Sequence, residues 1–186
     1  MSKKIYLVRH CKAEGQSPEA PLTKEGHLDA KRLAQYLSNK DIDEIYCSPF
    51  LRAQQTILPL SHETGIPIHA DRRLSEKVLS TCDLPDWIEK LRRSFDDMTL
   101  KFEGGESSLE ATKRAVSCMD NILKSNRETY VVVTHGCLMA LILKHYDSSF
   151  GSKEWEKLTN PDIYQLSFDE HMQSKITQVW HEKSLL

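Results

Sequence analysis

The chain has 186 residues, of which 39% are hydrophobic and 28% are charged, and its formal net charge is −2. The composition is that of a folded globular protein, and the length suits one core, so we expect residues 1–186 to form a single domain. A small negative charge provides no broad positive surface for DNA or RNA, which argues against a nucleic-acid partner.

Neither a membrane segment nor a metal site is expected. The first apolar run, Ile5–Val8, is too short for a secretory signal, and no run of about 18 apolar residues occurs. The five cysteines include no C-x-x-C pair, which suits neither a disulfide framework nor a zinc site. We therefore expect a cytoplasmic protein with reduced thiols, no membrane partner, and no metal or other cofactor.

The chain begins with a strand and a helix. The continuous apolar run Ile5–Val8 is typical of a strand that is buried on both faces, and it leads directly into Arg9 and His10. Thr23 is a suitable N-cap for a helix whose apolar positions continue to Leu37. Arg9 and His10 are thus expected at the carboxyl end of the first strand.

A second strand and helix follow. Ile45–Cys47 predicts a short strand, and residues 48–49 (Ser-Pro) open a helix, because proline is tolerated in a first helical turn. Arg52 then lies in that first turn, just past the strand. Ile66–His69 predicts a third strand.

The next part of the chain predicts a helical insertion at about residues 74–105. It mixes proline, tryptophan and many charges without strand patterning, and one helix is expected from about Pro85 to Phe95. Trp87, Leu91 and Phe95 recur at helical spacing, which favours a packing face over a substrate site, and the alternative is that part of this helix roofs the site.

The second half begins with a helix and another buried strand. Ser107–Glu110 matches a capping box, in which the first serine and the glutamate satisfy each other's backbone N–H groups at a helix start. Tyr130–Val133 is an apolar strand, and an apolar helix is expected over Cys137–Lys144. His135 therefore lies at a strand-to-helix junction.

The last segments complete the fold class. Ile163–Phe168 and Ile176–Trp180 alternate in polarity around a short turn and predict an antiparallel hairpin. The element order predicts an α/β fold, a three-layer α/β/α sandwich with a mostly parallel central sheet and a C-terminal antiparallel hairpin. Ligands of such sheets bind at the carboxyl ends of the strands. Four chemically active side chains are expected there: Arg9, His10, Arg52 and His135.

Two arginines and two histidines in one place suit phosphoryl transfer. A guanidinium group binds phosphate oxygens through a planar fork of donors and stays charged at any working pH. A neutral imidazole is a nucleophile that can carry a phosphoryl group, which splits one difficult displacement into two easier ones.

Five segments, in chain order, carry a family resemblance: Leu7–Cys11, Leu22–Gly26, Cys47–Thr56, Gly104–Ser107 and Val132–Gly136. Together they resemble the motifs of the histidine phosphatase superfamily, also called phosphoglycerate mutase-like. The resemblance covers nearly the whole chain and implies a phosphoglycerate mutase-like fold.

The resemblance also implies residue roles. His10 would be the nucleophile that accepts the phosphoryl group. Three further groups would bind that phosphoryl group and stabilise its transfer: Arg9, Arg52 and His135. Gln16 falls where the family often has a side chain that touches phosphate. Glu76 falls where many members carry the general acid, which protonates the leaving oxygen and later takes a proton from water, a role worth about 10² to 10⁴ in rate.

We therefore expect a histidine acid-type phosphatase that hydrolyses small phosphomonoesters through phospho-His10 without a metal. Two alternatives stay open: a 2,3-bisphosphoglycerate-dependent phosphoglycerate mutase and a noncatalytic, regulatory phosphate-binding module. Phosphoglycerate mutases of this superfamily are usually longer in the insertion, which favours the phosphatase. The sequence selects neither a natural substrate nor an oligomeric state.

Two further expectations concern the neighbours of these groups. Cys11 follows the proposed nucleophile, but cysteine phosphatases carry an arginine six residues after the cysteine, and Ser17 occupies that position here, so Cys11 is not expected to act as a nucleophile. Lys12, Arg72 and Arg73 are candidate contacts for an anionic substrate.

Overall fold

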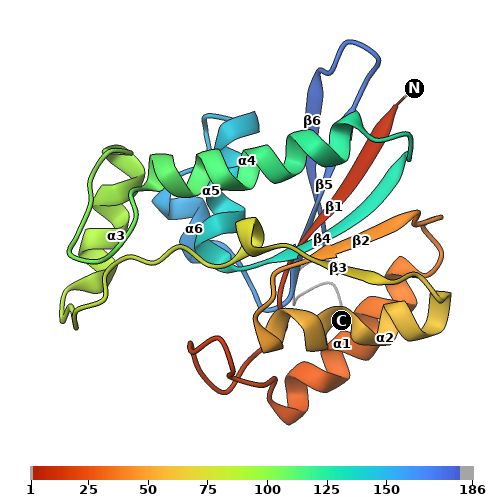
Figure 1. Ribbon diagram of the computed structural model, residues 1–186, viewed down its shortest axis with the longest axis horizontal. Helices are drawn as coiled ribbons and strands as arrows, with labels where there is room; N and C mark the ends of the chain where they lie inside the picture. Colours follow the sequence, from red (N-terminus) through yellow and green to blue (C-terminus); the bar gives the residue numbers. More distant parts are fainter. Residues whose placement is uncertain (1, 181–186) are drawn as a thin grey trace.

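The computed structural model describes residues 2–180 (Figure 1). In that part of the chain, six strands form one sheet in the order β3-β2-β4-β1-β5-β6. The strands are β1 (Lys3–Arg9), β2 (Glu44–Cys47), β3 (Ile68–Ala70), β4 (Thr129–Thr134), β5 (Asp162–Phe168) and β6 (Ser174–Trp180). Within the same residues, no helix is long and apolar enough to cross a membrane.

The strand directions confirm a mostly parallel sheet with an antiparallel hairpin at its end. β1 and β2 both pair in parallel with β4, and β3 pairs in parallel with β2. β5 pairs antiparallel with β1, and β6 antiparallel with β5. The strands β1 and β4 lie at the centre of the sheet and are covered on both faces, which explains their continuous apolar runs.

Helices cover both faces of the sheet. They are α1 (Lys24–Leu37), α2 (Leu51–Thr64), α3 (Trp87–Asp96), α4 (Ser108–Lys124), α5 (Gly136–Tyr146) and α6 (Ser152–Lys157), with a 3₁₀ turn η1 (Arg72–Leu74). α1 and α2 pack on one face of the sheet, and α4 and α5 pack on the other (Figure 1). The predicted three-layer α/β/α class is confirmed.

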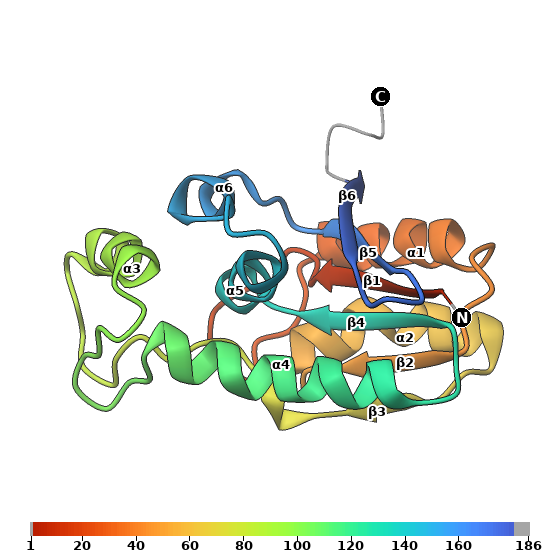
Figure 2. The ribbon, with the colours of Figure 1, turned by 90° about the horizontal axis from the view of Figure 1, so that it is seen from above.

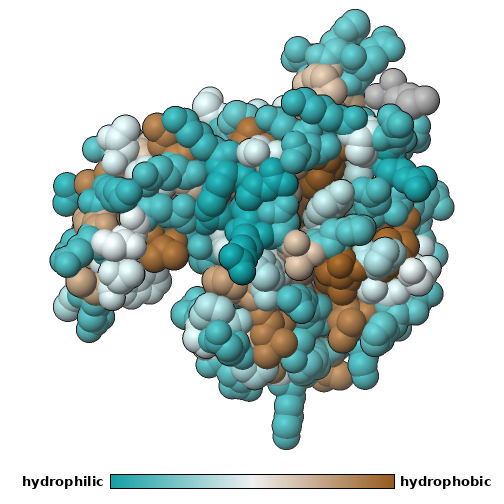
Figure 3. Space-filling model, viewed as in Figure 1, coloured by the Kyte–Doolittle hydropathy of each residue, from teal (hydrophilic) through white to brown (hydrophobic). Residues whose placement is uncertain are grey.

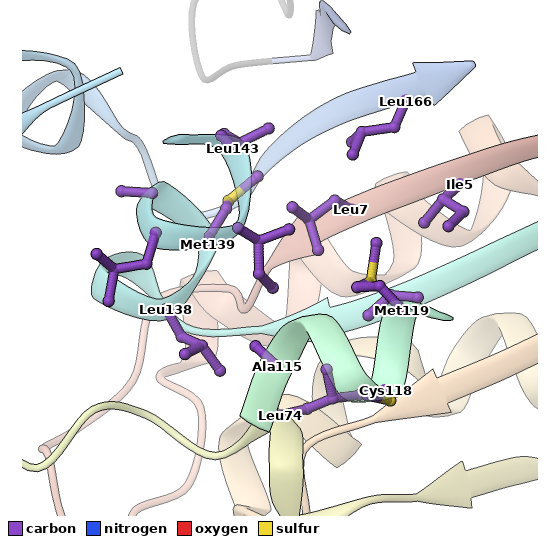
Figure 4. Packing of buried hydrophobic residues seen from close by; sticks show 14 of the residues in the cluster. Ile5, Leu7, Leu74, Ala115, Cys118, Met119, Leu138, Met139, Leu143 and Leu166 are labelled. Atoms are coloured by element: carbon purple, nitrogen blue, oxygen red, sulfur yellow. The ribbon is translucent and has the colours of Figure 1, made fainter. Parts of the chain in front are cut away.

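Alternation along the central strands divides the core into two halves. Ile5 and Leu7 of β1 point to the face covered by α4 and α5, where they pack with Met119, Leu138 and neighbouring side chains (Figure 4). Val8 belongs to the cluster on the opposite face, under α1 and α2. Each fully buried side chain of this size contributes about 1.5–3 kcal/mol. The positions of β1 and β4, and of the residues that follow them, are thereby fixed from both sides.

Local capping explains where two helices begin. The Thr23 hydroxyl accepts a hydrogen bond from the Gly26 N–H at 2.9 Å, as predicted for the N-cap of α1. The capping box of α4 is also confirmed, because Ser107 and Glu110 each accept from the backbone N–H of the other. Both helices therefore start where their side chains satisfy the first free N–H groups.

Helix α2 and strand β3 each begin about two residues later than predicted. Helix α2 begins at Leu51 and not at residues 48–49, because Phe50 is extended (ψ 138°) and serves as its N-cap. Strand β3 covers Ile68–Ala70 and not Ile66–His69. The Ile66 carbonyl accepts from the Ser61 hydroxyl at 2.6 Å, which holds that residue in the loop after α2 rather than in the sheet.

The predicted insertion lies beyond the end of the sheet. Its helix α3 starts at Trp87 and packs against the short helix α6, so that the two lie away from the sheet (Figure 2). Helix α6 was not predicted, since six residues are too few to show a helical period. In the space-filling view, a recess separates the part that contains α3 from the part that contains α1 and α2 (Figure 3).

Candidate active site

The four predicted side chains come together because three chain segments end at the same edge of the sheet. Val8 pairs with Val133 in the parallel ladder of β1 and β4, so the residues that follow the two strands are neighbours. His10 follows β1, and His135 follows β4 as the N-cap of α5. The centroids of these two imidazole rings are 5.1 Å apart. Arg52 enters from the first turn of α2.

The contacts of His10 show which of its ring nitrogens carries the hydrogen. Its Nδ1 lies 2.7 Å from the Cys11 carbonyl oxygen, which only accepts, so Nδ1 carries the hydrogen. Its Nε2 accepts a hydrogen bond from Nε of Arg52 at 3.1 Å. Burial lowers the pKa of His10 from 6.5 to about 3, and the charges of Arg52 and Arg9 act in the same direction. The ring is therefore neutral near pH 7, with its lone pair on Nε2.

Arg52 is a buried cation whose guanidinium group is held by backbone oxygens. Only 1% of the residue is exposed. Its Nη1 donates to the carbonyl oxygens of Gln16 and Ser17 at 3.1 and 2.8 Å. Burial lowers the pKa of Arg52, and the negative charge of Glu76 opposes this effect. The group remains a fixed donor beside His10.

Arg9 reaches the same place from the end of β1. Its Nη1 donates to the Leu158 carbonyl oxygen at 2.8 Å, while its buried Nε has no hydrogen-bond partner among residues 2–180. A Cβ atom at position 136 would lie 2.9 Å from the guanidinium carbon of Arg9. Gly136 is thus the residue that allows this guanidinium to lie against the start of α5.

His135 is fully buried and is oriented by a serine. Its Nε2 lies 2.7 Å from the hydroxyl oxygen of Ser48, which itself accepts from the Phe50 N–H at 3.3 Å. In the tautomer in which the Ser48 hydroxyl donates to Nε2, the ring hydrogen of His135 lies on Nδ1. Burial lowers the pKa of His135 well below 6.5, with the charges of neighbouring groups acting in the same direction. Its Nδ1 is buried and has no partner in the described part of the chain, and in that tautomer it is a donor suited to an anion.

Glu76 lies at the start of α5. Its two carboxylate oxygens accept from the backbone N–H groups of Cys137 and Leu138, at 3.1 and 2.9 Å, and one of them also accepts from Lys77. A carboxylate is favoured at a helix N-terminus by the direction of the peptide dipoles. Arg114 donates to the Glu76 carbonyl oxygen at 3.3 Å and so helps to hold its backbone.

A cavity of about 310 Å³ lies beside these groups, lined by Arg9, Gln16, Glu76, Lys77, Leu79, Trp87, Leu91, Gly136, Cys137 and Trp155. Three of the six predicted site residues are part of this lining. Gln16 contacts Arg52 through its backbone oxygen, and its side chain is exposed at the cavity. The predicted packing face of α3 is right for Phe95, which is buried, whereas Leu91 and the 48% exposed Trp87 line the cavity, in line with the alternative that part of this helix roofs the site. Helical spacing shows that residues share one face of a helix, but it does not show whether that face packs against protein or lines a cavity.

Other predicted contacts lie elsewhere. Lys12 pairs with Glu25 at 2.9 Å, and Arg73 pairs with Asp71 at 2.7 Å. Neither cation lines the cavity, and Arg72 borders a different hollow. These cations were proposed from charge alone, and charge does not show where a side chain points.

The thiol beside His10 is poorly suited to nucleophilic attack. Burial raises the pKa of Cys11 to about 12, so the thiol stays protonated near pH 7. In residues 2–180, no group of three or more His, Cys, Asp or Glu side chains is placed to hold a metal ion.

Sequence reasoning missed two positioning residues. Ser48 belongs to the segment that carried the family resemblance, so its position was visible although its contact with His135 was not. Asn160 donates its side-chain N–H to the His10 carbonyl oxygen at 2.8 Å from a loop 150 residues away. No local pattern reveals a contact of that separation.

The fold and the four convergent side chains define the phosphoglycerate mutase-like class of α/β proteins. A solved mycobacterial glucosyl-3-phosphoglycerate phosphatase shares this fold with a TM-score of 0.77 and 20% identity, over 96% of this chain and 98% of that one. The family model of the histidine phosphatase superfamily (branch 1) matches residues 5–179. The chain therefore belongs to that superfamily.

Relatives in this superfamily include both phosphatases and mutase-like proteins. Phosphoserine phosphatase 1 of Hydrogenobacter thermophilus is 28% identical over 148 residues, which cover 71% of this chain and 70% of that protein. A probable phosphoglycerate mutase of an Enterobacter species is 29% identical over 160 residues, which cover 75% and 74%. The chain is thus similar to enzymes that act on phosphate esters.

Proposed function

We propose that this protein hydrolyses phosphomonoesters through a phosphohistidine formed on Nε2 of His10. The observation that carries the proposal is the state of that imidazole. Its Nδ1–H is held by the Cys11 carbonyl, so the lone pair is on Nε2, where it accepts from Nε of Arg52 until a bound phosphoryl group takes over that donor. A neutral nucleophile beside a fixed cation is what attack on an anionic phosphoryl group requires.

In the first step, the Nε2 lone pair attacks phosphorus. An N–P bond forms while the bond between phosphorus and the ester oxygen breaks. Glu76 donates a proton to the departing oxygen, so that the product leaves as an alcohol. The nonbridging oxygens are bound by three groups: Arg9, Arg52 and His135. Nδ1 of His135 and Nε of Arg9 are buried and have no protein partners among the described residues, and they suit this role.

In the second step, water attacks the phosphorus of phospho-His10. The Glu76 carboxylate takes one proton from the water, the N–P bond breaks, and its electron pair returns to Nε2. Inorganic phosphate leaves, and both side chains regain their first state. The two guanidinium groups supply positive charge to both transition states, so we expect dialysis against a chelator to leave turnover unchanged.

The decisive variant is His10→Ala. We expect kcat/KM for phenyl phosphate to fall by about 10⁴ or more, as for other enzymes that lose a nucleophile. His62→Ala is the matched control, because that histidine is exposed on α2. In wild type, rapid quenching followed by mass spectrometry should find an acid-labile phosphoryl group on the His10 peptide. Full activity of His10→Ala, with an unchanged circular dichroism spectrum, would refute the proposal.

A mutase is the second candidate, because several relatives carry that name. It is tested with 3-phosphoglycerate and 2,3-bisphosphoglycerate, using NMR to identify the products. We expect inorganic phosphate and glycerate to exceed 2-phosphoglycerate. Formation of 2-phosphoglycerate at a rate equal to or above hydrolysis would make the protein a mutase.

A further inference from the structure

The cavity beside the catalytic groups has an apolar wall made by three separate segments. Leu79 precedes α3, Trp87 and Leu91 lie on α3, and Trp155 lies on α6. The ring centroids of the two tryptophans are 6.4 Å apart in an edge-to-face arrangement. Arg9 and Glu76 line the same cavity, so the wall is continuous with the place where the phosphoryl group is expected to bind.

One side of the wall is firmly packed and the other is open. The ring centroids of Trp155 and Phe95 are 6.3 Å apart. Phe95 is only 2% exposed, so the core fixes the position of Trp155 through this contact. Trp87 is about half exposed at the outer side. A ligand part can therefore enter past Trp87 and rest against a fixed aromatic surface.

Two cations, Lys77 and Arg9, are part of the lining among the described residues. Nζ of Lys77 donates to the hydroxyl oxygens of Ser94 and Ser108 at 2.9 and 3.0 Å, between α3 and α4. Arg9, the other cation of the lining among the described residues, lies at the phosphoryl end. A carboxylate placed against the four side chains Leu79, Trp87, Leu91 and Trp155 would lose water and gain no cation from them.

We propose, on the basis of the function proposed above, that the substrates are phosphomonoesters with a compact, uncharged and apolar leaving group. Such a group lies against the wall formed by Leu79, Trp87, Leu91 and Trp155, where its contact with water is lost. Esters with a carboxylate or a second phosphate on the leaving group are disfavoured. The cavity volume of about 310 Å³ sets the size limit, since it is small for a ligand site.

The first test uses ethyl, butyl and hexyl phosphate, whose alcohols differ in apolar length but little in chemical reactivity. We expect kcat/KM to rise about two- to fourfold for each added methylene until the cavity is filled. Pentyl phosphate is then compared with 4-carboxybutyl phosphate, in which a carboxylate replaces the end methyl. We expect the charged ester to be at least roughly tenfold poorer.

The second test removes the wall. Trp87→Ala and Trp155→Ala should each lower the ratio of kcat/KM for hexyl over ethyl phosphate by at least about threefold. Ile88→Ala is the matched control, because Ile88 is an exposed neighbour on α3 that does not line the cavity. Circular dichroism checks the fold of each variant. The inhibition constants of hexylphosphonate and ethylphosphonate measure the same preference for the longer chain. This is a binding measurement and does not depend on turnover.

The outcomes separate the two proposals. Turnover by His10→Ala refutes the catalytic function. If turnover depends on His10 but is independent of chain length, or if the carboxylated ester is preferred, only the inference about the leaving group is refuted. A preference for the carboxylated ester that is lost in Lys77→Met would show that this amine takes the carboxylate instead.

Discussion

The phosphoryl end of the site and the wall beside it are built in different ways. Arg9, His10 and His135 follow directly from β1 and β4, which are paired to each other and covered on both faces. The wall comes from α3 and α6, which lie beyond the sheet and are joined through side chains, such as the contact between Trp87 and Trp155. Backbone hydrogen bonds fix the first part, and side-chain packing fixes the second.

This difference separates the chemistry from the choice of substrate. The ladder between β1 and β4 is made of backbone groups, so replacing a phosphoryl-binding side chain leaves the pairing of the two strands in place. The wall changes whenever one of its side chains is replaced. Substitutions in the first part are therefore expected to alter the rate for every substrate, whereas those in the second alter the ratio between substrates.

After the loss of the nucleophile itself, the largest effect is expected from Arg52→Lys. A lysine keeps the charge but cannot donate to His10, Gln16 and Ser17 at once, as the guanidinium does. We expect kcat/KM to fall by about 10³ for all esters alike, similar to the loss of an oxyanion donor. Steady-state kinetics measure this, with Arg32→Lys on the exposed side of α1 as control. A loss below tenfold would show that charge alone suffices.

A smaller effect is expected from Ser48→Ala. The variant leaves Nε2 of His135 without its partner at 2.7 Å, so the ring hydrogen is no longer held on Nδ1. We expect kcat to fall about tenfold, which corresponds to the loss of one buried hydrogen bond. ¹⁵N NMR of the histidines should show a change of tautomer, and Ser117→Ala, at an exposed serine, serves as control. An unchanged tautomer with unchanged kcat would contradict the assigned role.

Lys77→Met tests the side-chain connections of the second region. Burial lowers the pKa of Lys77 from 10.5, so above the folded-state pKa the unfolded chain binds more protons than the folded one. Wild-type stability therefore gains from Lys77 as the pH rises towards 10.5, and the variant lacks this gain.

We expect the unfolding free energies of wild type and Lys77→Met to differ by about 1 kcal/mol at pH 7. The wild type should become relatively more stable as the pH rises. Urea denaturation at several pH values measures this, with the exposed Lys113→Met as control. A difference independent of pH would mean that the amine is not buried in solution.

The smallest effect is expected from Gln16→Ala. Gln16 contacts Arg52 through its backbone oxygen, which the substitution keeps, and its side chain is exposed. We expect kcat/KM for phenyl phosphate to change by no more than about twofold, as for other surface substitutions. A tenfold loss in the same assay would show that the side chain itself binds phosphate.

The two regions also differ in how far sequence could predict them. The strand ends that carry Arg9, His10 and His135 were predictable because long apolar runs define buried strands, and parallel strands end at one edge. Glu76 was found only by resemblance, since its partners at the start of α5 lie about 60 residues further along the chain.

The wall was largely beyond prediction. Trp155 lies on a helix too short to show periodicity, and its importance depends on packing against α3. Trp87 was assigned to a packing face because spacing alone cannot distinguish a face that meets protein from one that meets a cavity. Contacts between segments of low periodicity are set by the tertiary structure as a whole.

The loop between α6 and β5 supports Arg9 and His10, and this has a consequence for biosynthesis. The carbonyl oxygen of His10 accepts from Asn160, and Arg9 donates to the Leu158 oxygen, so both depend on residues made late during translation. A ribosome-bound chain that ends after α5 can pair β1 with β4, yet it lacks these supports. Nascent chains should therefore acquire an ordered phosphate site only once residue 160 has left the exit tunnel.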